Sequence, residues 1–310
     1  MLSLETVQEI YHRPLLSLIF TAQAVHRQYH PADRVQLCTL ANIKSGNCPE
    51  DCKYCPQSRR YTTGIAVYPL LSVAEVLRQA EVAKANGSTR FCMGAAWRQV
   101  PEGQEFAAIL EMVRGVRALG LEACMTLGMV KPHQAQALAQ AGLTAYNHNL
   151  DTSATFYPEI ITTRAYSDRL ETIKHIAAAG IEVCCGGIIG MGESHEDRIM
   201  LLHTLANLQP PPQSVPINAL VPIPGTPLGD RPPVSALELA RVIATARLLM
   251  PQAMIRLSAG RKQMSVSDQA LCFLAGANSI FTGEKLLTTP NPGTDSDRDL
   301  LAQLGLTPLC

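Results

Sequence analysis

The 310-residue sequence is 47% apolar and 17% charged, and its 26 basic side chains balance its 26 acidic ones. This balance argues against nucleic acid or an anionic membrane surface as a partner, because both attract proteins with excess positive charge. No apolar run is long enough to cross a bilayer, so we expect no transmembrane helix. The ten cysteines, without a secretory signal pattern, predict a reducing, cytoplasmic compartment and thiol or metal chemistry rather than a disulfide framework.

Residues 1–34 are predicted to form a helical extension. Within residues 1–20, Glu5, Glu9 and Arg13 interrupt an apolar pattern. This predicts an amphipathic helix rather than a secretory signal, and the acidic residues argue against a transit peptide.

Strand-like and helix-like segments alternate after this extension. Ser72, Ser194 and Ser235 each precede an acidic residue by three positions, which is the spacing of a helix capping box or its Asp variant. Strand–helix units of roughly thirty residues indicate parallel βαβ units. Eight of them predict a (β/α)8 TIM-type barrel in a single domain, 1–310, with 288–310 as a C-terminal tail. The predicted strands are 35–44, 90–95, 122–128, 144–151, 182–190, 214–223, 253–260 and 278–283.

The segment CPEDCKYC, residues 48–55, gathers three thiols with the spacing C-x3-C-x2-C. They are Cys48, Cys52 and Cys55, in the loop after the first predicted strand. A zinc site or an exposed thiol cluster is the alternative, but structural zinc takes four ligands and no fourth lies at a matching spacing. An iron–sulfur cube held by three cysteines leaves one iron for an external ligand. The spacing therefore favours such a cube.

Further cysteines lie inside predicted strands. Cys92, Cys124 and Cys184 fall in the second, third and fifth strands, and Arg256 falls in the seventh. Side chains alternate between the two faces of a strand, so each of these can point into the barrel, but Cys184 and Cys185 cannot both do so. A single strand cysteine is commonly a small buried apolar residue. Together, however, the three thiols and the guanidinium predict a group on the barrel axis, below the first three cysteines.

The three-cysteine motif, with Tyr54 before its last cysteine, resembles the radical S-adenosylmethionine superfamily. Further segments, from about residue 36 to residue 292, resemble the biotin synthases within it. The resemblance implies an enzyme that inserts sulfur between C6 and C9 of dethiobiotin by radical chemistry and forms biotin. These segments are CPEDCKYCPQS, RFCMGAAWR, LEACMTLG, YNHNLDTS, VCCGGIIGMGE, VPINALVPIPGTPL, RLSAGR and GANSIFTGEKLLTTPNP.

The resemblance also implies two clusters and their ligands. S-adenosylmethionine would be cleaved at a 4Fe–4S cluster, and a 2Fe–2S cluster would supply sulfide. A guanidinium is effectively always protonated, so a buried counter-ion is the alternative role of Arg256. Cys184 matches the family's V-C-x-G-G, whereas Cys185 stands where the family usually has a small hydroxyl residue. The implied ligands are Cys48, Cys52 and Cys55 for the first cluster and Cys92, Cys124, Cys184 and Arg256 for the second.

Contacts to S-adenosylmethionine are implied in the same way. Asp151 would bind the ribose, and Asn149 would lie between the nucleoside and the substrate. Arg169 would meet the methionine carboxylate, unless it lies on a solvated helix face. The full implied set is Tyr54, Asn149, Asp151, Arg169 and Gly190.

Substrate contacts follow from the matching segments. Asn149 and Asn218 would bind dethiobiotin, Asn218 through its ureido ring. The backbone N–H groups of Thr288 and Thr289 would bind the valerate carboxylate. His148, between two asparagines, is interpreted as a core histidine with satisfied polar atoms.

Partners are also implied by the resemblance. They are an external one-electron reductant of the flavodoxin or ferredoxin type, the iron–sulfur assembly machinery and a second copy in a homodimer.

One alternative function is that of another radical enzyme on the same barrel, related to hydrogenase maturases or amino-acid mutases, which would not need the strand cysteines. The other is a non-catalytic iron–sulfur carrier, which would not cleave S-adenosylmethionine. Lipoyl synthase fits less well, because its additional N-terminal cysteine motif does not occur here.

Overall fold

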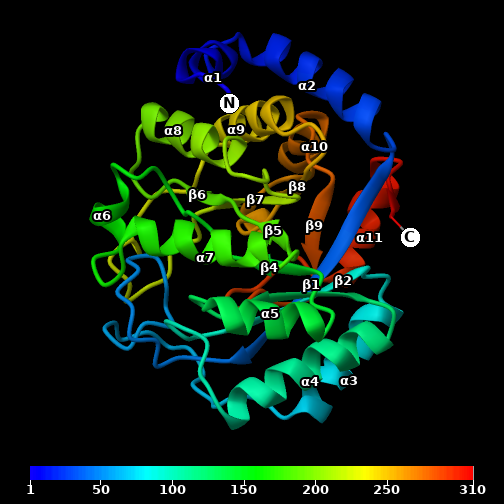
Figure 1. The fold of residues 1–310 in the computed structure, drawn as a ribbon. Coiled ribbons are helices and arrows are strands. Elements are labelled where there is room, and N and C mark those ends of the chain that lie inside the picture. The colour runs from blue at the N-terminus through cyan, green and yellow to red at the C-terminus, as the bar shows by residue number, and fades with distance from the viewer. Residues whose placement is uncertain (310) are drawn as a thin grey trace.

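The computed structural model describes residues 1–309, and a closed barrel of parallel strands lies at its centre (Figure 1). The last barrel strand pairs with the first, where Phe281 faces Cys38, and this pairing closes the barrel. The predicted (β/α)8 TIM-type barrel is confirmed. The strands are β1 (Arg34–Lys44), β2 (Arg90–Ala95), β3 (Glu122–Thr126), β4 (Ala145–Asn147), β5 (Glu182–Cys184), β6 (Gly187–Ile189), β7 (Ser214–Ala219), β8 (Met254–Leu257) and β9 (Ser279–Thr282).

The strand predicted at 182–190 is interrupted at Cys185 and Gly186, which separate β5 from β6. Both parts keep the same register against β7. A Cβ atom on Gly186 would lie 1.9 Å from the carbonyl oxygen of Pro216. Only glycine therefore fits where the two backbones approach, and β5 and β6 together fill the fifth of the eight barrel positions.

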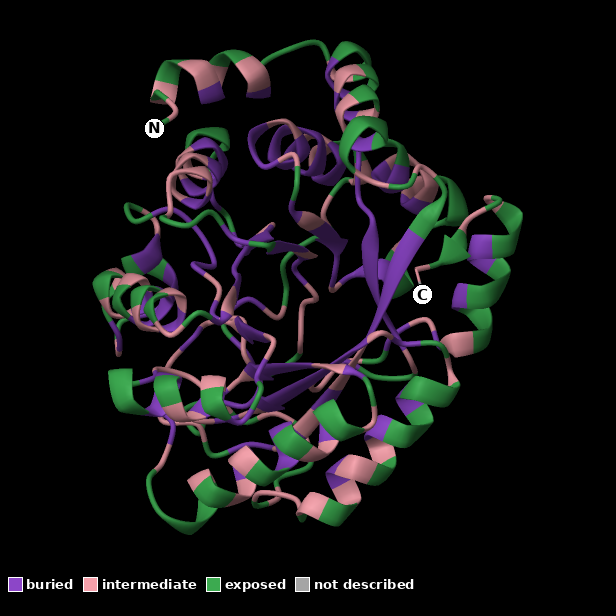
Figure 2. Cartoon of the chain, turned by 45° about the vertical axis from the view of Figure 1, so that its right-hand side comes forward, coloured by how far each residue is buried: buried purple, intermediate pink, exposed green. Residues whose placement is uncertain are grey.

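Helices cover the outside of the barrel, with their buried sides toward the strands and their exposed sides toward solvent (Figure 2). Two of the predicted caps have the expected partners, because Ser72 and Ser194 accept hydrogen bonds from the N–H groups three residues on. Ser235 instead accepts from Leu237, two residues on. The helices are α3 (Val73–Ala85), α4 (Gln104–Ala118), α5 (Pro132–Gln140), α6 (Tyr157–Ile160), α7 (Tyr166–Ala178), α8 (His195–Ala206), α9 (Ala236–Leu249) and α10 (Val266–Leu274).

The N-terminal extension contains two helices where residues 1–20 had predicted one. They are α1 (Leu4–Tyr11) and α2 (Leu15–Tyr29), and they pack on α8 and α9. The break lies at Pro14, because proline lacks a backbone N–H and disfavours a helical conformation in the preceding residue. Within residues 1–309, no helix is both long enough and apolar enough to span a membrane.

The predicted C-terminal tail, 288–310, packs against the barrel. It contains α11 (Thr294–Gln303) and β10 (Thr307–Pro308), which adds to the outer edge of β1. Arg261 is fully buried and holds α11 through an ion pair with Asp297. The last residue of the predicted tail lies outside the described residues.

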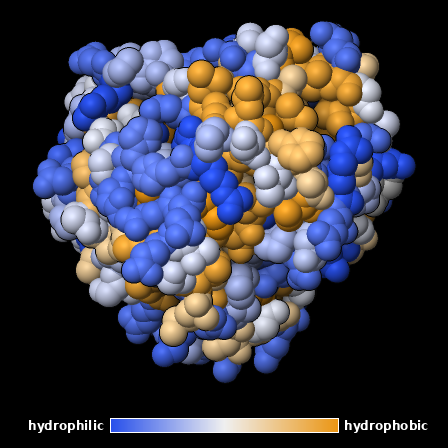
Figure 3. Space-filling model, turned by 90° about the horizontal axis from the view of Figure 1, so that it is seen from above, coloured by the Kyte–Doolittle hydropathy of each residue, from blue (hydrophilic) through white to orange (hydrophobic). Residues whose placement is uncertain are grey.

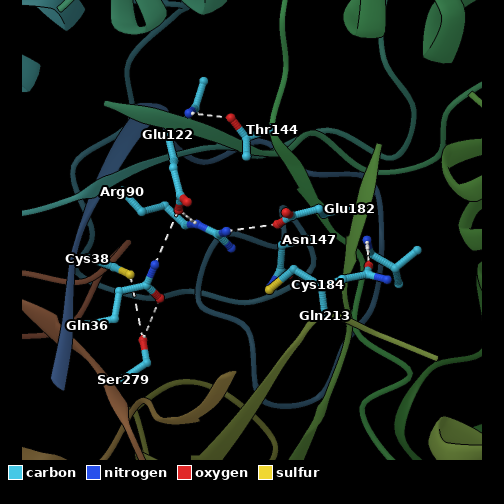
Figure 4. A network of polar contacts seen from close by, with 12 residues as sticks. Gln36, Cys38, Arg90, Glu122, Thr144, Asn147, Glu182, Cys184, Gln213 and Ser279 are labelled. Carbon is cyan, nitrogen blue, oxygen red and sulfur yellow. Dashed lines mark hydrogen bonds and ion pairs between the residues drawn. The ribbon is translucent and has the colours of Figure 1, made fainter. Parts of the chain in front are cut away.

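A network of polar side chains closes the N-terminal end of the barrel (Figure 4). Arg90 donates from Nε to Glu122 at 2.6 Å and from Nη2 to Glu182 at 3.0 Å. Gln36 donates to Glu122 at 3.2 Å and accepts from Ser279 at 3.1 Å. These side chains lie near the starts of five strands, so they form a floor under the barrel interior. We call Gln36, Arg90, Glu122, Glu182 and Ser279 the barrel floor.

Two stacked histidines join α2 to α9. The buried ring of His26 lies 5.5 Å from that of His30, centroid to centroid. His30 Nε2 lies 2.9 Å from Nη1 of Arg247, a buried residue of α9. Burial, followed by the charge of Arg247, lowers the pKa of His26 to about 4. His26 is therefore neutral in the folded protein at neutral pH.

We expect acid to destabilise the fold through His26. In the unfolded chain the ring has its ordinary pKa of 6.5. Between that value and the folded-state pKa the unfolded state binds more protons, so the free energy of unfolding falls as the pH falls. The loss from this group is roughly 2 kcal/mol between about pH 7.5 and about pH 5. Thermal melts across this range measure it. The His26→Phe protein should depend less on pH, and an unchanged slope would contradict the assignment.

Candidate functional site

A cavity of about 320 Å³ lies among the C-terminal ends of the strands and the loops that follow them. Its wall brings together most of the site residues that the sequence predicts. Cys184 and Gly190 are not among the residues that line it. The predicted residues in the wall are Cys48, Cys52, Tyr54, Cys55, Cys92, Cys124, Asn149, Asp151, Arg169, Asn218, Arg256, Thr288 and Thr289.

The first three thiols lie in the loop between β1 and α3. The N–H of Cys55 donates to the carbonyl of Cys52 at 2.9 Å. The N–H of Cys48 donates to Gln57 at 2.9 Å, and its carbonyl accepts from Arg59 at 2.9 Å. These bonds fold the loop back on itself, so that all three thiols line one cavity. We call Cys48, Cys52 and Cys55 the loop thiols.

The loop thiols fit an anionic iron–sulfur cluster in burial and charge. Burial raises the pKa of Cys48, and it raises the pKa of Cys55 to about 12. Both are therefore protonated until a metal displaces the proton. Arg164 is buried in the cavity wall, and its Nε has no hydrogen-bond partner within residues 1–309. In the same range, no group of three or more His, Cys, Asp or Glu side chains is arranged to hold a single metal ion.

A second group of thiols lies deeper in the barrel, on the strands. Cys92 and Cys124 face each other on β2 and β3, and Cys124 also contacts Cys184 on β5. The wholly buried guanidinium of Arg256, on β8, lies 3.8 Å from Cys184 Sγ. Cys185 belongs instead to the apolar core between the barrel and the helices, which decides the orientation that the sequence left open. We call Cys92, Cys124 and Cys184 the strand thiols.

Cys38, on β1, is a buried thiol that the sequence analysis missed. Its Sγ accepts a hydrogen bond from Arg256 Nη2 at 3.3 Å. It also packs in one buried cluster with Cys92 and Cys124. The strand pattern contained the signal, because Cys38 and Leu40 share a face of β1 and Leu40 pairs with Cys92.

Asp151, Arg169 and Tyr54 form one buried network. The hydroxyl of Tyr54 donates to Asp151 Oδ2 at 2.7 Å, and Arg169 Nη2 lies 2.6 Å from the same oxygen. Arg169 also donates to the carbonyl of Asn149 at 2.6 Å. Asp151 has φ of 67°, in the left-handed region that aspartate tolerates better than most residues. Because Arg169 is 4% exposed, the alternative of a solvated helix face is wrong.

The two predicted asparagines brace the backbone around the cavity. Asn149 Oδ1 accepts from the N–H of Gly186 at 3.0 Å. Asn218 donates to the carbonyl of Gly187 at 3.0 Å and accepts from the N–H of Ala259 at 3.2 Å. An amide has two donor hydrogens and two acceptor lone pairs, so both side chains keep capacity for a bound molecule.

Gly190 lies in a braced turn outside the cavity wall. It has φ of 100°, and a Cβ atom there would lie 2.3 Å from Val234. Its N–H donates at 2.8 Å to Glu193, which in turn pairs with Arg198 at 2.8 Å. Glu193, the glutamate of the GGIIGMGE segment, therefore holds the turn. Gly190 does not line the cavity, so its predicted contact with S-adenosylmethionine gains no support from the structure.

His148 differs from its interpretation as a satisfied core histidine. It lines the cavity, and its Nε2 has no hydrogen-bond partner within residues 1–309. Burial, followed by the charges of Arg169 and Arg164, lowers its pKa well below the ordinary value. The neutral ring therefore has a polar atom available to a bound molecule.

Thr288 and Thr289 lie in the loop after β9. This loop is held by a bond from Leu286 N–H to Thr289 at 2.9 Å and by one from Asn42 to the carbonyl of Leu287 at 2.9 Å. Within residues 1–309, the backbone N–H groups of both threonines have no acceptor. Two adjacent free donors at the cavity wall suit an anionic group.

Two family profiles match the sequence. The Radical SAM superfamily matches residues 42–205, and the Biotin and Thiamin Synthesis associated domain matches residues 216–307. The chain is 69% identical over 308 residues to the biotin synthase of Synechococcus sp. (strain JA-3-3Ab), covering 99% of both sequences. It is 57% identical to the mitochondrial biotin synthase of Arabidopsis thaliana, covering 99% of this chain and 81% of the relative.

Solved structures share the fold. Methylornithine synthase has a TM-score of 0.83 at 19% identity, over 100% of this chain and 95% of that one. The FeFe-hydrogenase maturase from Carboxydothermus hydrogenoformans has a TM-score of 0.84 at 16% identity, over 99% of this chain and 76% of that one. Identities this low show the fold alone, whereas the similarity to biotin synthases is high and spans nearly the whole chain. The chain therefore belongs to the biotin synthase family of the radical SAM superfamily.

Proposed function

We propose that this protein converts dethiobiotin to biotin by radical-mediated insertion of sulfur between C6 and C9. Family membership makes it an enzyme of the radical SAM sulfurtransferase type, and the superfamily match implies a 4Fe–4S cluster and S-adenosylmethionine. One observation carries the proposal: the loop thiols and two of the strand thiols line one cavity, and the third strand thiol, Cys184, contacts Cys124 beside it. Radical formation needs only one such set, so the second is suited to supply sulfur.

The loop thiols would hold the 4Fe–4S cluster, with one iron left for S-adenosylmethionine. The strand thiols, with Arg256 beside them, would hold a 2Fe–2S cluster. When bound, these groups supply the electron that cleaves S-adenosylmethionine, the resulting 5′-deoxyadenosyl radical and the sulfur atom of the product. The guanidinium groups of Arg164 and Arg256, buried beside the two sets, support the binding of anionic clusters.

Side chains between the two thiol sets are suited to orient two small molecules. Asp151 would exchange its present partners for ribose hydroxyls, and Arg169 would bind the methionine carboxylate as a planar, charged donor. Asn149 would lie between the nucleoside and the substrate. Asn218 would pair with the ureido ring, whose donors and acceptor complement an amide.

The cavity would also protect a reactive radical from water and stray C–H groups. The barrel floor closes the end beneath the strand thiols. At the other end, the free N–H groups of Thr288 and Thr289 would bind the valerate carboxylate of dethiobiotin. Holding the substrate at both its ring and its carboxylate would keep C6 and C9 within reach of the radical.

The strand thiols distinguish this proposal from its alternatives. A related radical enzyme on the same barrel would need the loop thiols alone, and an iron–sulfur carrier would not cleave S-adenosylmethionine. A visible spectrum after anaerobic reconstitution should contain the bands of both cluster types. Complementation of a biotin auxotroph that accumulates dethiobiotin tests the whole reaction.

Replacing any loop thiol by alanine should remove the reductive cleavage of S-adenosylmethionine, because three thiolates are the fewest that hold the cluster. We expect 5′-deoxyadenosine formation to fall by about a hundredfold or more in Cys48→Ala, Cys52→Ala and Cys55→Ala. The product is measured by chromatography after reduction with dithionite. Cys272→Ala is the control, since Cys272 is a buried thiol on α10 that does not line the cavity. Normal cleavage in a loop-thiol variant would refute the assignment.

Cys124→Ala should separate the two half-reactions. We expect 5′-deoxyadenosine to form still, at least in part, while biotin does not, because the variant keeps the loop thiols and loses the central strand thiol. The ratio of 5′-deoxyadenosine to biotin in a single turnover is the measurement. Biotin formation at the normal rate would show that the strand thiols do not hold the sulfur source.

We also propose how the protein is partnered. The chain would form a single domain, 1–310, and function in the cytoplasm. There a flavodoxin or ferredoxin would supply electrons, and the iron–sulfur assembly machinery would restore the clusters. The chain would form a homodimer through α2. Leu16 and Phe20, one helical turn apart, are 79% and 77% exposed. Figure 3 shows apolar surface gathered on the face over which the N-terminal helices lie, and such patches commonly mark interfaces.

Charge placed on α2 should disrupt this homodimer. We expect the double variant Leu16→Glu, Phe20→Glu to be monomeric by light scattering, because two carboxylates would be buried without partners in the interface. Val82→Glu is the matched control, since Val82 is 57% exposed on α3, away from α2. A dimer that persists in the double variant would exclude α2 as the contact.

A further inference from the structure

The loop that carries the loop thiols is tied to the segment that follows α6. Asp51 lies directly before Cys52 in this loop. Its carboxylate accepts hydrogen bonds from the N–H groups of Thr162 and Thr163 at 2.9 and 3.2 Å. The hydroxyl of Thr162 also donates to it, and the hydroxyl of Thr163 accepts from the N–H of Asp51 at 3.1 Å. These bonds fix the two segments to each other, although 111 positions separate Asp51 from Thr162.

Glu50 forms a second, buried tie to the same segment. It is 3% exposed, and its Oε2 accepts from the hydroxyl of Thr163 at 2.5 Å. Its Oε1 lies 3.3 Å from Nη1 of Arg98, which donates to the carbonyl of Thr163 at 2.7 Å. A buried carboxylate is costly unless it is paired and hydrogen-bonded, and Glu50 has both kinds of partner. We call Glu50, Asp51, Thr162 and Thr163 the loop clamp.

The loop clamp places the next residue, Arg164, in the wall of the cavity. Arg164 is 9% exposed and lines the cavity together with the loop thiols. Within residues 1–309, its Nε has no hydrogen-bond partner and its guanidinium forms no ion pair. Burial raises the pKa values of Cys48 and Cys52, and the charge of Arg164 opposes this rise. The guanidinium therefore acts directly on two of the loop thiols.

The acidic side chains of the cavity wall are already engaged with other groups. Among residues 1–309, the wall contains two of them, Glu50 and Asp151. Glu50 is held in the loop clamp, and Asp151 pairs with Arg169 at 2.6 Å. A buried cation needs an anionic partner. The partner of Arg164 must therefore come with a bound group, and an iron–sulfur cluster on the loop thiols brings sulfides and thiolates.

We propose that Arg164 donates hydrogen bonds to sulfur atoms of the 4Fe–4S cluster and makes it easier to reduce, and that the loop clamp positions Arg164 for this role. Reduction by one electron makes the cluster more negative, and a fixed cation with a directed N–H group favours the more negative state. The inference rests on the proposed function, because it requires that cluster at the loop thiols.

The test measures the reduction potential of the loaded protein rather than its activity. Wild type and variants are reconstituted anaerobically without S-adenosylmethionine, and the reduced 4Fe–4S cluster is quantified by electron paramagnetic resonance at a series of set potentials. Arg164→Met and Arg164→Lys change the guanidinium, and Thr163→Val removes one hydroxyl of the loop clamp. Arg59→Met is the matched control, because Arg59 lies in the same loop but is exposed, where solvent and salt screen its charge. Melting temperature and iron content show whether each variant is folded and loaded.

We expect the ratio of reduced to oxidised cluster at a fixed potential to fall about tenfold in Arg164→Met, which is about 59 mV for a one-electron couple. Arg164→Lys should lie between Arg164→Met and wild type, since lysine keeps the charge but not the planar fork. Arg59→Met should keep the wild-type ratio. Thr163→Val should lower the ratio in the wild-type background but not further in Arg164→Met, because the loop clamp acts through Arg164.

A folded and loaded Arg164→Met protein with the wild-type ratio would overturn the inference. If that protein instead bound S-adenosylmethionine more weakly, Arg164 would be assigned to that molecule. If Arg164→Met holds no cluster, the ratios of Arg164→Lys and Thr163→Val decide the question, and wild-type values in both would overturn the inference. An effect of Thr163→Val that persists in Arg164→Met would refute the role of the loop clamp. A folded wild type without any 4Fe–4S cluster would instead refute the proposed function.

Discussion

The alternation of side chains on closed parallel strands decides what this protein can hold. Every second residue of a barrel strand points to the axis. Cys38 and Arg256 therefore meet, although 218 positions separate them in the sequence. The same alternation turns Cys185 into the apolar core while its neighbour Cys184 faces inward. No single segment contains the deep thiol group, because it exists only once β9 has paired with β1 and closed the barrel.

Buried charge is a second constraint, because it limits what can bind among the side chains that point into the barrel. Arg169 forms an ion pair with Asp151, but within residues 1–309 Arg164 and Arg256, which also line the cavity, form no ion pair with a carboxylate. A cation is costly to bury alone. These unpaired cations therefore favour the binding of anionic groups, and sulfide-containing clusters are anionic. The neutral His148 and the free N–H groups of the Thr288 loop add polarity without adding positive charge.

Local patterns in the sequence predicted the barrel, the loop thiols and the strand thiols, because strand alternation and motif spacing are short-range signals. Cys38 was missed because its position beside Cys92 and Cys124 depends on the register between β1 and β2, which no local pattern contains. The break between β5 and β6 depends on a close approach to Pro216 of another strand. Burial of Arg169 likewise depends on tertiary contacts. The break at Pro14, in contrast, was visible in the sequence, since proline ends helices by its own covalent structure.

The barrel floor of Gln36, Arg90, Glu122, Glu182 and Ser279 lies across the N-terminal end of the barrel, and the cavity lies at the other end, among the loops that follow the strands. A molecule bound beside the loop at Cys48 would lie between solvent and the strand thiols. Any group that binds at the strand thiols would therefore have to enter before that molecule binds or after it leaves. The arrangement of the barrel thus sets the order in which the two sites can be filled.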